Sequence, residues 1–168
     1  MIWFYNQMKE VTVPSASTRK QLVQRGLPAE KIKPLPRWVD TEIFSPSKKD
    51  PHFWQKHGLN NKIKFLYVGR VSKEKNLKLL ADAFIDIINA GYQSDLIIVG
   101  DGAMRNELEQ ILNGYPVVFT GFLSGDELSA IYASSDVFVF PSTTDTFGNV
   151  VLEAQASGLP VIVSDEGG

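Results

Sequence analysis

The sequence contains no cysteine and only two histidines among its 168 residues. The missing thiols exclude disulfide bridges, thiolate catalysis and cysteine-bearing zinc sites. The two histidines, His52 and His57, stand close to prolines and glycines, which favours solvated positions over a metal cluster. We therefore expect no metal centre. The absence of cysteine also suits a cytoplasmic protein.

Long hydrophobic runs and strong charge are missing as well. No stretch reaches the roughly 20 apolar residues that span a bilayer. The apolar start Met1–Tyr5 lacks the basic region and the cleavage site of a signal peptide, so we interpret it as the end of an element from a longer chain. The formal net charge of −2 gives no electrostatic attraction to nucleic acid, and we expect no nucleic-acid partner.

From residue 65 onward, short apolar runs alternate with amphipathic segments. The apolar runs predict strands at 65–68, 95–99, 117–119, 137–140 and 161–163. Between them, apolar residues recur at the three- and four-residue spacings of one helix face. Continuous apolar strands are typical of a parallel sheet that is covered by helices on both faces. The pattern predicts an α/β fold with a doubly wound, Rossmann-like sheet, whose ligands bind beyond the carboxyl ends of the strands.

The first 36 residues differ from this pattern. Val11–Val13 predicts a short strand, Ser15 is expected to cap a helix that ends at Gly26, and Lys31–Leu35 is a candidate second strand. We predict two parts: residues 1–36 form a strand–helix unit with a linker, and residues 37–168 form the sheet domain. Because the sequence stops directly after a predicted strand, we expect both domains to be truncated at the chain ends.

A glycine-led loop at 69–76 follows the first strand of the sheet and precedes a helix. Gly69 allows a sharp turn and a close backbone approach to a ligand. A helix start offers free amide groups and the positive end of a dipole, and Arg70 and Lys75 add the charge that a diphosphate needs. Basic loops are also common on plain surfaces, so a solvated loop is an equally good interpretation.

A second loop follows the fourth strand. Gly148 and Asn149 stand where the next helix begins, so their amides are also available to a phosphate. Glu153 falls within about one and a half turns of that helix start and is expected to face the same crevice. The apolar neighbours predict a largely buried helix, in which a carboxylate needs a partner or a ligand. An exposed helix carboxylate is the alternative.

Two weaker signals flank the same crevice. Gly100 and Gly102 enclose Asp101 in a tight turn, although glycines at strand ends are usually turn punctuation. Gly121 and Phe122 offer an apolar wall and backbone groups to a nucleobase, and strand-end packing explains them equally well. A Gly-x-Gly-x-x-Gly motif is absent after the first strand, which argues against a nicotinamide cofactor.

Together these motifs resemble glycosyltransferase family 4, whose members are retaining enzymes with the GT-B fold. The matching segments are Gly69–Arg70 with Lys75–Asn76, Val99–Gly102, Gly121–Phe122, Pro141–Ser142, Phe147–Ala154 and Ser157–Val161. Val13–Ser15 and Val39–Phe44 look like the family's crossing between its two domains. The resemblance covers nearly the whole chain and implies the C-terminal, donor-binding half of such an enzyme. It implies that residues 1–36 are the last strand–helix unit of the N-terminal acceptor domain with its linker, and that residues 37–168 are the donor-binding domain.

The resemblance also implies roles for individual residues. Arg70 and Lys75 would hold the diphosphate of the donor and stabilise it as it leaves, while Glu153 would bind the ribose hydroxyls. Asp145 stands eight residues before Glu153, where the family usually has a glutamate that contacts the transferred sugar, and we count it as catalytic with Arg70 and Lys75. The predicted donor-binding residues are Gly69, Arg70, Lys75, Gly121, Phe122, Asp145, Phe147, Gly148, Asn149, Val150 and Glu153.

The implied function is transfer of a hexose, such as mannose or glucose, from GDP-mannose or a UDP-sugar to a glycan or lipid acceptor. No metal or other cofactor is expected. The acceptor would be bound by an N-terminal domain outside this sequence, so the chain alone is expected to be inactive. The full enzyme is expected in the cytoplasm or associated peripherally with the inner face of the membrane. A catalytically silent nucleotide-sugar-binding module and a GT-B-shaped epimerase remain alternatives.

Overall fold

The computed structural model describes residues 2–35, 38–59, 63–144 and 148–165. These residues fall into two compact units, one up to Trp38 and one from Val39 onward, and each is described by itself. The predicted domain boundary between residues 36 and 37 lies outside the described residues and stays a prediction. None of the described helices combines the length and the apolar character needed to cross a bilayer.

The smaller unit is a single β–α–β arrangement. Its elements are α1 (Ile2–Asn6), β1 (Val11–Val13), α2 (Ala16–Gln24), the 3-10 turn η1 (Ala29–Lys31) and β2 (Ile32–Pro34). The two strands are parallel, and Val13, Leu27 and Ile32 form their buried core. The predicted cap is present, because the Ser15 hydroxyl accepts a hydrogen bond from the Thr18 amide at 3.1 Å.

The larger unit contains a five-stranded parallel sheet. Its strands are β3 (Ile63–Val68), β4 (Ser94–Val99), β5 (Val117–Gly121), β6 (Val137–Phe140) and β7 (Val161–Val163), in the spatial order β5-β4-β3-β6-β7. The chain winds outward from β3 to β5 and then returns to place β6 on the other side of β3. The order therefore reverses between β3 and β6, and such a switch point opens a crevice at the carboxyl ends of the strands.

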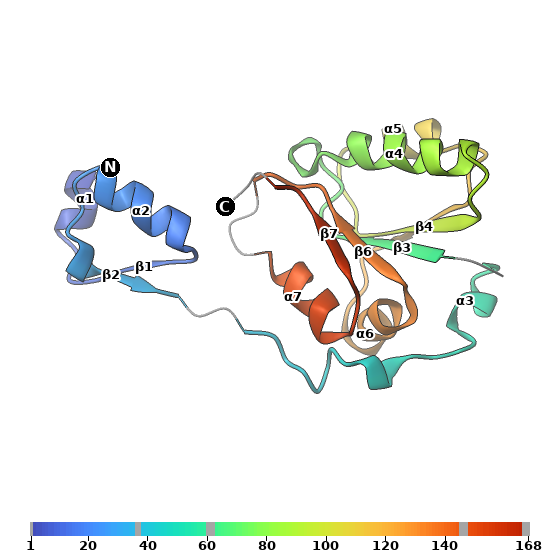
Figure 1. Ribbon diagram of the computed structural model, residues 1–168, viewed down its shortest axis with the longest axis horizontal. Coiled ribbons are helices and arrows are strands. Elements are labelled where there is room, and N and C mark those ends of the chain that lie inside the picture. The colour runs from blue at the N-terminus through green and yellow to red at the C-terminus, as the bar shows by residue number, and fades with distance from the viewer. Residues whose placement is uncertain (1, 36–37, 60–62, 145–147, 166–168) are drawn as a thin grey trace. The chain divides into compact units, whose positions relative to one another are not determined.

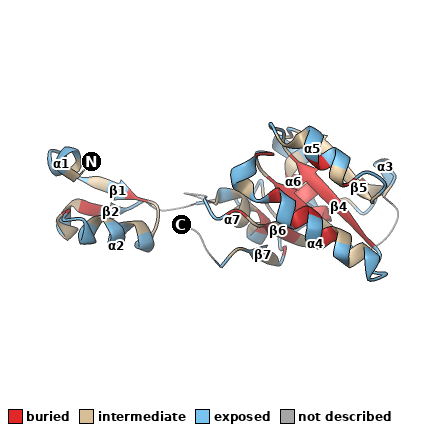
Figure 2. Cartoon of the chain, turned by 90° about the horizontal axis from the view of Figure 1, so that it is seen from above, coloured by how far each residue is buried: buried red, intermediate tan, exposed pale blue. Residues whose placement is uncertain are grey.

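Helices cover both faces of this sheet. Figure 1 shows α4 (Leu77–Asn89) and α5 (Arg105–Ile111) on one face, and α6 (Gly125–Ser134) and α7 (Asn149–Ala156) on the other. Burial concentrates in the sheet between the two helix layers, and every residue of β4 is buried (Figure 2). The predicted doubly wound α/β fold is confirmed.

The segment between residue 39 and β3 packs against α6. It contains the 3-10 turn η2 (Pro46–Lys48) and the short helix α3 (Phe53–Lys56). The Trp54 indole nitrogen donates to the carbonyl oxygen of Ser134, and the Asp50 amide donates to the Ser134 hydroxyl at 3.2 Å. The segment that contains η2 and α3 therefore packs onto the same helix layer as α6.

The loops after β3 and β4 touch along their backbones. The Gly69 amide donates to the Val99 carbonyl at 3.0 Å, and the Val71 amide donates to the Asp101 carbonyl at 2.9 Å. A Cβ atom on Gly100, which has a φ of +124°, would lie 2.0 Å from the carbonyl oxygen of Gly69. Only glycine permits this contact. Gly100 is therefore more than a turn residue, because it allows the loops after β3 and β4 to lie in contact.

The loop at 69–76 differs in one respect from its expected form. It does not lead directly into a helix, because the 3-10 turn η3 (Lys73–Lys75) intervenes. Asn76 then adopts a left-handed conformation with a φ of 54°, and α4 begins only at Leu77. The start of α4 is therefore separated from Gly69 by a turn of its own.

Candidate functional site

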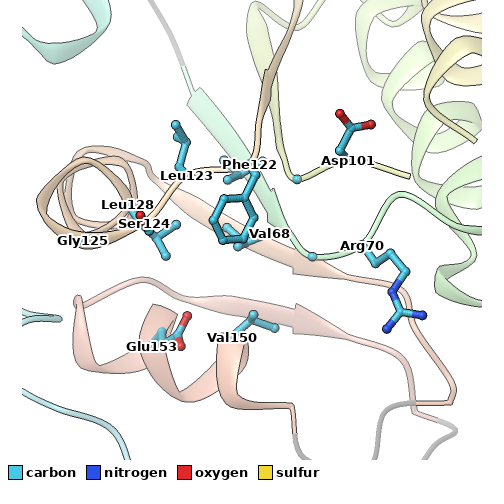
Figure 3. A pocket seen from close by; sticks show the side chains of 13 residues that line it. Val68, Arg70, Asp101, Phe122, Leu123, Ser124, Gly125, Leu128, Val150 and Glu153 are labelled. Atoms are coloured by element: carbon cyan, nitrogen blue, oxygen red, sulfur yellow. The ribbon is translucent and has the colours of Figure 1, made fainter. Parts of the chain in front are cut away.

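A cavity of about 490 Å³ opens at the carboxyl ends of β3 and β4 and beside the loop after β5 (Figure 3). Helices α6 and α7 close its other side. Its volume is in the range of small-molecule binding sites. The lining residues are Val68, Gly69, Arg70, Val99, Gly100, Asp101, Phe122, Leu123, Ser124, Gly125, Leu128, Val150 and Glu153.

Five of the residues predicted from the sequence line this one cavity. Gly69 and Arg70 come from the loop after β3, Phe122 from the loop after β5, and Val150 and Glu153 from α7. In Figure 3 the side chains of Arg70 and Glu153 lie on opposite sides of the pocket, with the Phe122 ring between them. The fold therefore brings together segments that are more than 80 residues apart in the sequence.

Lys75 does not belong to the lining of this cavity. It lies in η3 and is half-buried, and its ammonium group sits 5.7 Å from the centre of the Phe140 ring. Phe140 is the last residue of β6, so Lys75 lies at the carboxyl edge of the same sheet, near a different strand end from Arg70. Contact of both cations with one diphosphate stays a prediction.

The other predicted residues lie beside the cavity or outside the described part of the chain. Gly121 ends β5, and its carbonyl oxygen accepts a hydrogen bond from the Gly100 amide at 2.7 Å. Gly148 precedes α7 with a φ of 56°, and Asn149 is the exposed first residue of that helix. Asp145 and Phe147 fall outside the described residues.

Arg70 combines a fixed backbone with an exposed side chain. Its side chain is 73% exposed and pairs with Glu74, with 3.5 Å between Nη1 and Oε1. Its carbonyl oxygen accepts a hydrogen bond from the buried Tyr67 hydroxyl at 2.9 Å. Tyr67 also lies directly beneath Gly69, where a Cβ atom would meet its hydroxyl at 2.8 Å. The backbone is thus held in place while the guanidinium group remains accessible to a ligand.

Glu74 is the surface partner of Arg70 in this loop. The pKa of its carboxyl is lowered, first by the nearby polar groups of its own backbone and of Ser72, and further by the charges of Arg70 and Lys75. A carboxylate thus occupies part of the field that a phosphate would use. Because the pair is exposed, water and salt screen it, and a stronger anion can replace Glu74.

Unlike Glu74, Glu153 is a carboxylate that is bonded to a buried side chain. It is half-buried, and its Oε2 accepts a hydrogen bond from the Tyr132 hydroxyl at 2.9 Å. Burial raises the pKa of Glu153, and the hydrogen bond from Tyr132 opposes that change. The surrounding helix is less buried than expected: Ala154 is its only buried residue.

The sequence did not single out Tyr132. The residue is completely buried in α6, and burial, followed by the negative charge of Glu153, raises the pKa of its hydroxyl. Tyr132 therefore stays protonated and acts as a hydrogen-bond donor. The available signal was a tyrosine among apolar residues of a helix, since a buried tyrosine hydroxyl normally finds a partner. That signal does not identify the partner.

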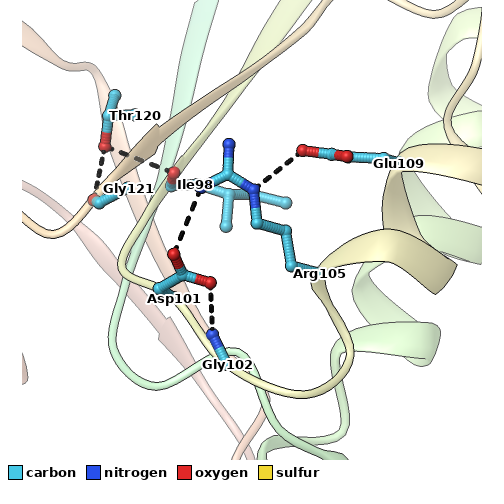
Figure 4. A network of polar contacts seen from close by, with 7 residues as sticks. All are labelled: Ile98, Asp101, Gly102, Arg105, Glu109, Thr120 and Gly121. Carbon is cyan, nitrogen blue, oxygen red and sulfur yellow. Dashed lines mark hydrogen bonds and ion pairs between the residues drawn. The ribbon is translucent and has the colours of Figure 1, made fainter.

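Asp101, which lines the cavity, also belongs to a network of polar contacts (Figure 4). Asp101 accepts a hydrogen bond from the Gly102 amide at 2.7 Å and pairs with Arg105 at 3.4 Å. Arg105 also donates to Glu109 at 2.8 Å, and its guanidinium lies 5.9 Å from the centre of the Phe119 ring. Because carboxylates on two sides already engage Arg105, it serves as a brace between the β4 loop and α5.

The middle of the cavity is apolar. Phe122 is 81% exposed, and Leu123 and Leu128 stand beside it on the loop and on α6. An accessible aromatic ring provides a stacking surface for a flat heterocycle. The cavity therefore offers a cation, an apolar surface and a hydrogen-bond acceptor. Within the described ranges, carboxylate and imidazole groups form no cluster suited to a metal ion.

The sequence of this chain matches a protein family model and several curated proteins. The family model described as "Glycosyl transferases group 1" matches residues 62–168. A sulfoquinovosyl transferase of Arabidopsis thaliana is 38% identical, and the alignment covers 100% of this chain and 33% of that protein. A GDP-mannose-dependent alpha-mannosyltransferase of Mycolicibacterium smegmatis is 37% identical over 98% of this chain and 41% of its own length.

A solved structure agrees with these matches. The crystal structure of HepE from Anabaena in complex with UDP and glucose superposes with a TM-score of 0.83 at 25% identity, covering 99% of this chain and 47% of that one. The chain thus spans less than half the length of these relatives. The doubly wound sheet is the C-terminal half of a GT-B fold, as the resemblance implied. The chain belongs to the glycosyl transferases group 1 family.

Proposed function

We propose that this chain is the donor-binding part of a glycosyltransferase that transfers a hexose from a nucleoside diphosphate sugar, with retention, to a glycan or lipid acceptor. The observation that carries the proposal is the single cavity with Arg70 at one side, Glu153 at the other and Phe122 between them. Two relatives support the donor class: one is named as GDP-mannose-dependent, and the other was solved with UDP and glucose.

The chemistry of these residues suits a nucleotide donor. Negative charge develops on the diphosphate as the bond to the sugar breaks, and a positioned cation lowers the energy of that state. Arg70 supplies this cation, and Lys75, at the neighbouring strand end, supplies a second. Side-chain cations then perform the role that a metal ion performs in other transferases, so no cofactor is required. Asp145 and the amides of Gly148 and Asn149 complete the proposal on the sugar side.

The other half of the reaction belongs to the whole protein. The acceptor would bind to a domain outside this chain, so the isolated chain should bind donor without transferring sugar. A lipid acceptor would place the reaction at the cytoplasmic face of a membrane, with the protein bound peripherally.

Donor binding is the first test. Isothermal titration calorimetry on the full-length protein, with UDP, GDP, UDP-glucose and GDP-mannose, should give binding with at least one nucleotide and its sugar. The Arg70→Ala variant should bind that nucleotide more weakly, while Arg25→Ala, which removes an exposed arginine of the smaller unit, should match the wild type. Failure of all four compounds to bind would overturn the proposal.

Turnover is the second test. Incubating donor and glycan or lipid acceptors with the full-length protein, followed by NMR of the product, reports transfer and the configuration at the anomeric carbon. Isomerised donor without acceptor would indicate an epimerase instead. Transfer that appears only after Asp145→Glu would indicate a silent binding module.

A further inference from the structure

A buried hydroxyl reaches the wall of the cavity from beneath. Tyr132 belongs to α6, is completely buried, and donates to Oε2 of Glu153 at 2.9 Å across 21 residues of sequence. Glu153 belongs to α7 and lines the cavity. The hydrogen bond therefore joins the two helices that cover one face of the sheet, at the side chain of Glu153 that lines the cavity.

Two aromatic rings restrict the position of Tyr132. The Phe44 ring meets it edge to face, with 5.5 Å between the ring centres and an angle of 86° between the planes. The Phe138 ring of β6 lies on another side at 5.8 Å. A close-packed aromatic side chain has few alternative orientations, so the position of its hydroxyl is set by the core. The donor is thus fixed before any ligand arrives.

The hydrogen bond leaves one carboxylate oxygen available. Tyr132 engages Oε2, and within the described part of the chain no protein hydrogen bond reaches Oε1 of Glu153. An ionised carboxylate accepts about four hydrogen bonds, so it retains capacity for two neighbouring hydroxyl groups. Vicinal hydroxyls are the feature that distinguishes a ribose from a deoxyribose. Fixing Oε2 also limits rotation of the carboxylate, which reduces the entropy lost when a ligand binds.

We propose that Tyr132 is a positioning residue for sugar recognition: it holds Oε2 of Glu153 so that the carboxylate is presented, already oriented, to the vicinal hydroxyls of the donor's ribose. This inference rests on the proposed function, since it assigns the Glu153 side of the cavity to the ribose of a nucleoside diphosphate. It adds that selectivity for ribose comes from a pair of residues, of which only Glu153 touches the ligand.

A tyrosine that only packs the core makes a different prediction. Loss of packing would weaken binding of every nucleotide alike or lower stability without changing selectivity. Loss of orientation at Glu153 weakens binding only of ligands that carry the ribose hydroxyls. Selectivity between a ribonucleotide and its 2′,3′-dideoxy counterpart therefore separates the two roles.

The experiment measures this selectivity in the full-length protein. Calorimetry with UDP and GDP identifies the nucleotide that the wild type binds, and the matching 2′,3′-dideoxynucleoside diphosphate is then titrated. We expect the wild type to prefer the ribonucleotide by about ten- to a hundredfold, as for hydrogen bonds to a charged group. Tyr132→Phe should reduce that preference by about three- to tenfold and leave affinity for the dideoxynucleotide within about twofold.

Two further variants make the result specific. Tyr115→Phe removes the hydroxyl of a half-buried tyrosine that is not among the cavity-lining residues, and it should keep the wild-type preference. Glu153→Ala should abolish most of the preference, and adding Tyr132→Phe to it should change the remainder by less than about twofold, because the tyrosine acts through the carboxylate. Retained dideoxynucleotide binding shows in each case that the variant is folded.

Each outcome has one meaning. If the wild type binds neither UDP nor GDP, the proposed function fails. If it binds one of them but Tyr132→Phe keeps the full ribose preference, the positioning role fails and the proposed function stands. Equal weakening toward both forms of the nucleotide also overturns the positioning role, since that is the effect of packing alone.

Discussion

The two sides of the cavity hold their charges in opposite ways. The guanidinium group of Arg70 is mostly in solvent and pairs with Glu74 at the surface, while only its backbone is fixed. The carboxylate of Glu153 is half-buried and bonded to a hydroxyl in the core. An exposed cation on a long side chain can follow a phosphate as its charge and position change. A fixed carboxylate instead binds only a ligand whose hydroxyl groups match its orientation.

From this difference we expect the two sides of the cavity to contribute to different kinetic quantities. The Arg70 side should contribute mainly to rate, because a mobile cation has its greatest effect where negative charge develops. The Glu153 side should contribute mainly to affinity and selectivity, because a preoriented acceptor acts equally on bound donor and on the transition state. The following variants are ordered by the size of effect that this contrast predicts.

Arg70→Ala should have the largest effect. We expect transfer by the full-length protein to fall by about a hundred- to a thousandfold, as when one stabilising group is removed from an active site. Arg70→Lys should lie between this variant and the wild type, since an ammonium keeps the charge but not the planar, forked donor arrangement. Initial rates measure the effect, and thermal unfolding should show no change because the side chain is exposed. A rate within about twofold of the wild type would remove Arg70 from the mechanism.

Gly100→Ala should damage the framework of the Arg70 side. The new Cβ atom would lie 2.0 Å from the Gly69 carbonyl oxygen, at a φ of +124° that favours glycine. We expect a loss of about 3 kcal/mol in the free energy of unfolding, measured by urea denaturation. Gly114→Ala is the matched control, because Gly114 also has a positive φ, of +86°, but no atom within 4 Å of the added Cβ. The control should lose only about 1 kcal/mol.

Glu153→Gln should weaken nucleotide binding by about tenfold, because the neutral amide is a poorer acceptor for ribose hydroxyls. The same substitution should raise the free energy of unfolding at neutral pH, although it weakens binding. Burial raises the folded-state pKa of Glu153 above its unfolded value, so stability is lost as the pH rises through the folded-state pKa. The variant should therefore be more stable than the wild type at neutral pH, and the difference should vanish below the ordinary pKa of a glutamate. Denaturation curves across this pH range, with calorimetry, measure both effects.

Glu74→Gln should have the smallest effect. Removing the surface partner of Arg70 frees the cation, so nucleotide affinity should rise, by less than about threefold because exposed ion pairs are weak. The gain should shrink as salt is added, which calorimetry at two ionic strengths would reveal. A decrease in affinity would show instead that Glu74 orients Arg70 and does not compete with the phosphate.

The sheet could be predicted from the sequence because its signal is local and repeated. Continuous apolar runs such as β4 and the helix spacing of Leu77, Leu80 and Phe84 each report burial directly. The convergence of Arg70 and Glu153 also followed, since parallel strands present their carboxyl ends at one edge. Asp145 and Phe147 remain predictions, because they lie outside the described residues.

Other parts of the site depend on contacts that no local pattern encodes. Gly100 has the composition of an ordinary turn, and the sequence does not show that the carbonyl oxygen of Gly69 occupies the space of its missing side chain. The sequence predicts that Lys75 and Arg70 hold one diphosphate, but Lys75 belongs to η3 and its ammonium group lies against the Phe140 ring. Tyr132 has the spacing of a core residue, and only the packing of α6 beside α7 reveals its partner.

The pairing of the β3 and β4 loops through main-chain groups has a consequence for how this site can change over evolutionary time. Amide-to-carbonyl bonds at Gly69 and Val71 join the loops through groups that almost every residue type supplies. An exposed neighbouring position such as Ala103 can therefore vary in size and polarity while the guanidinium-bearing segment keeps its place. Substitution there does not require the scaffold that carries Arg70 to be rebuilt.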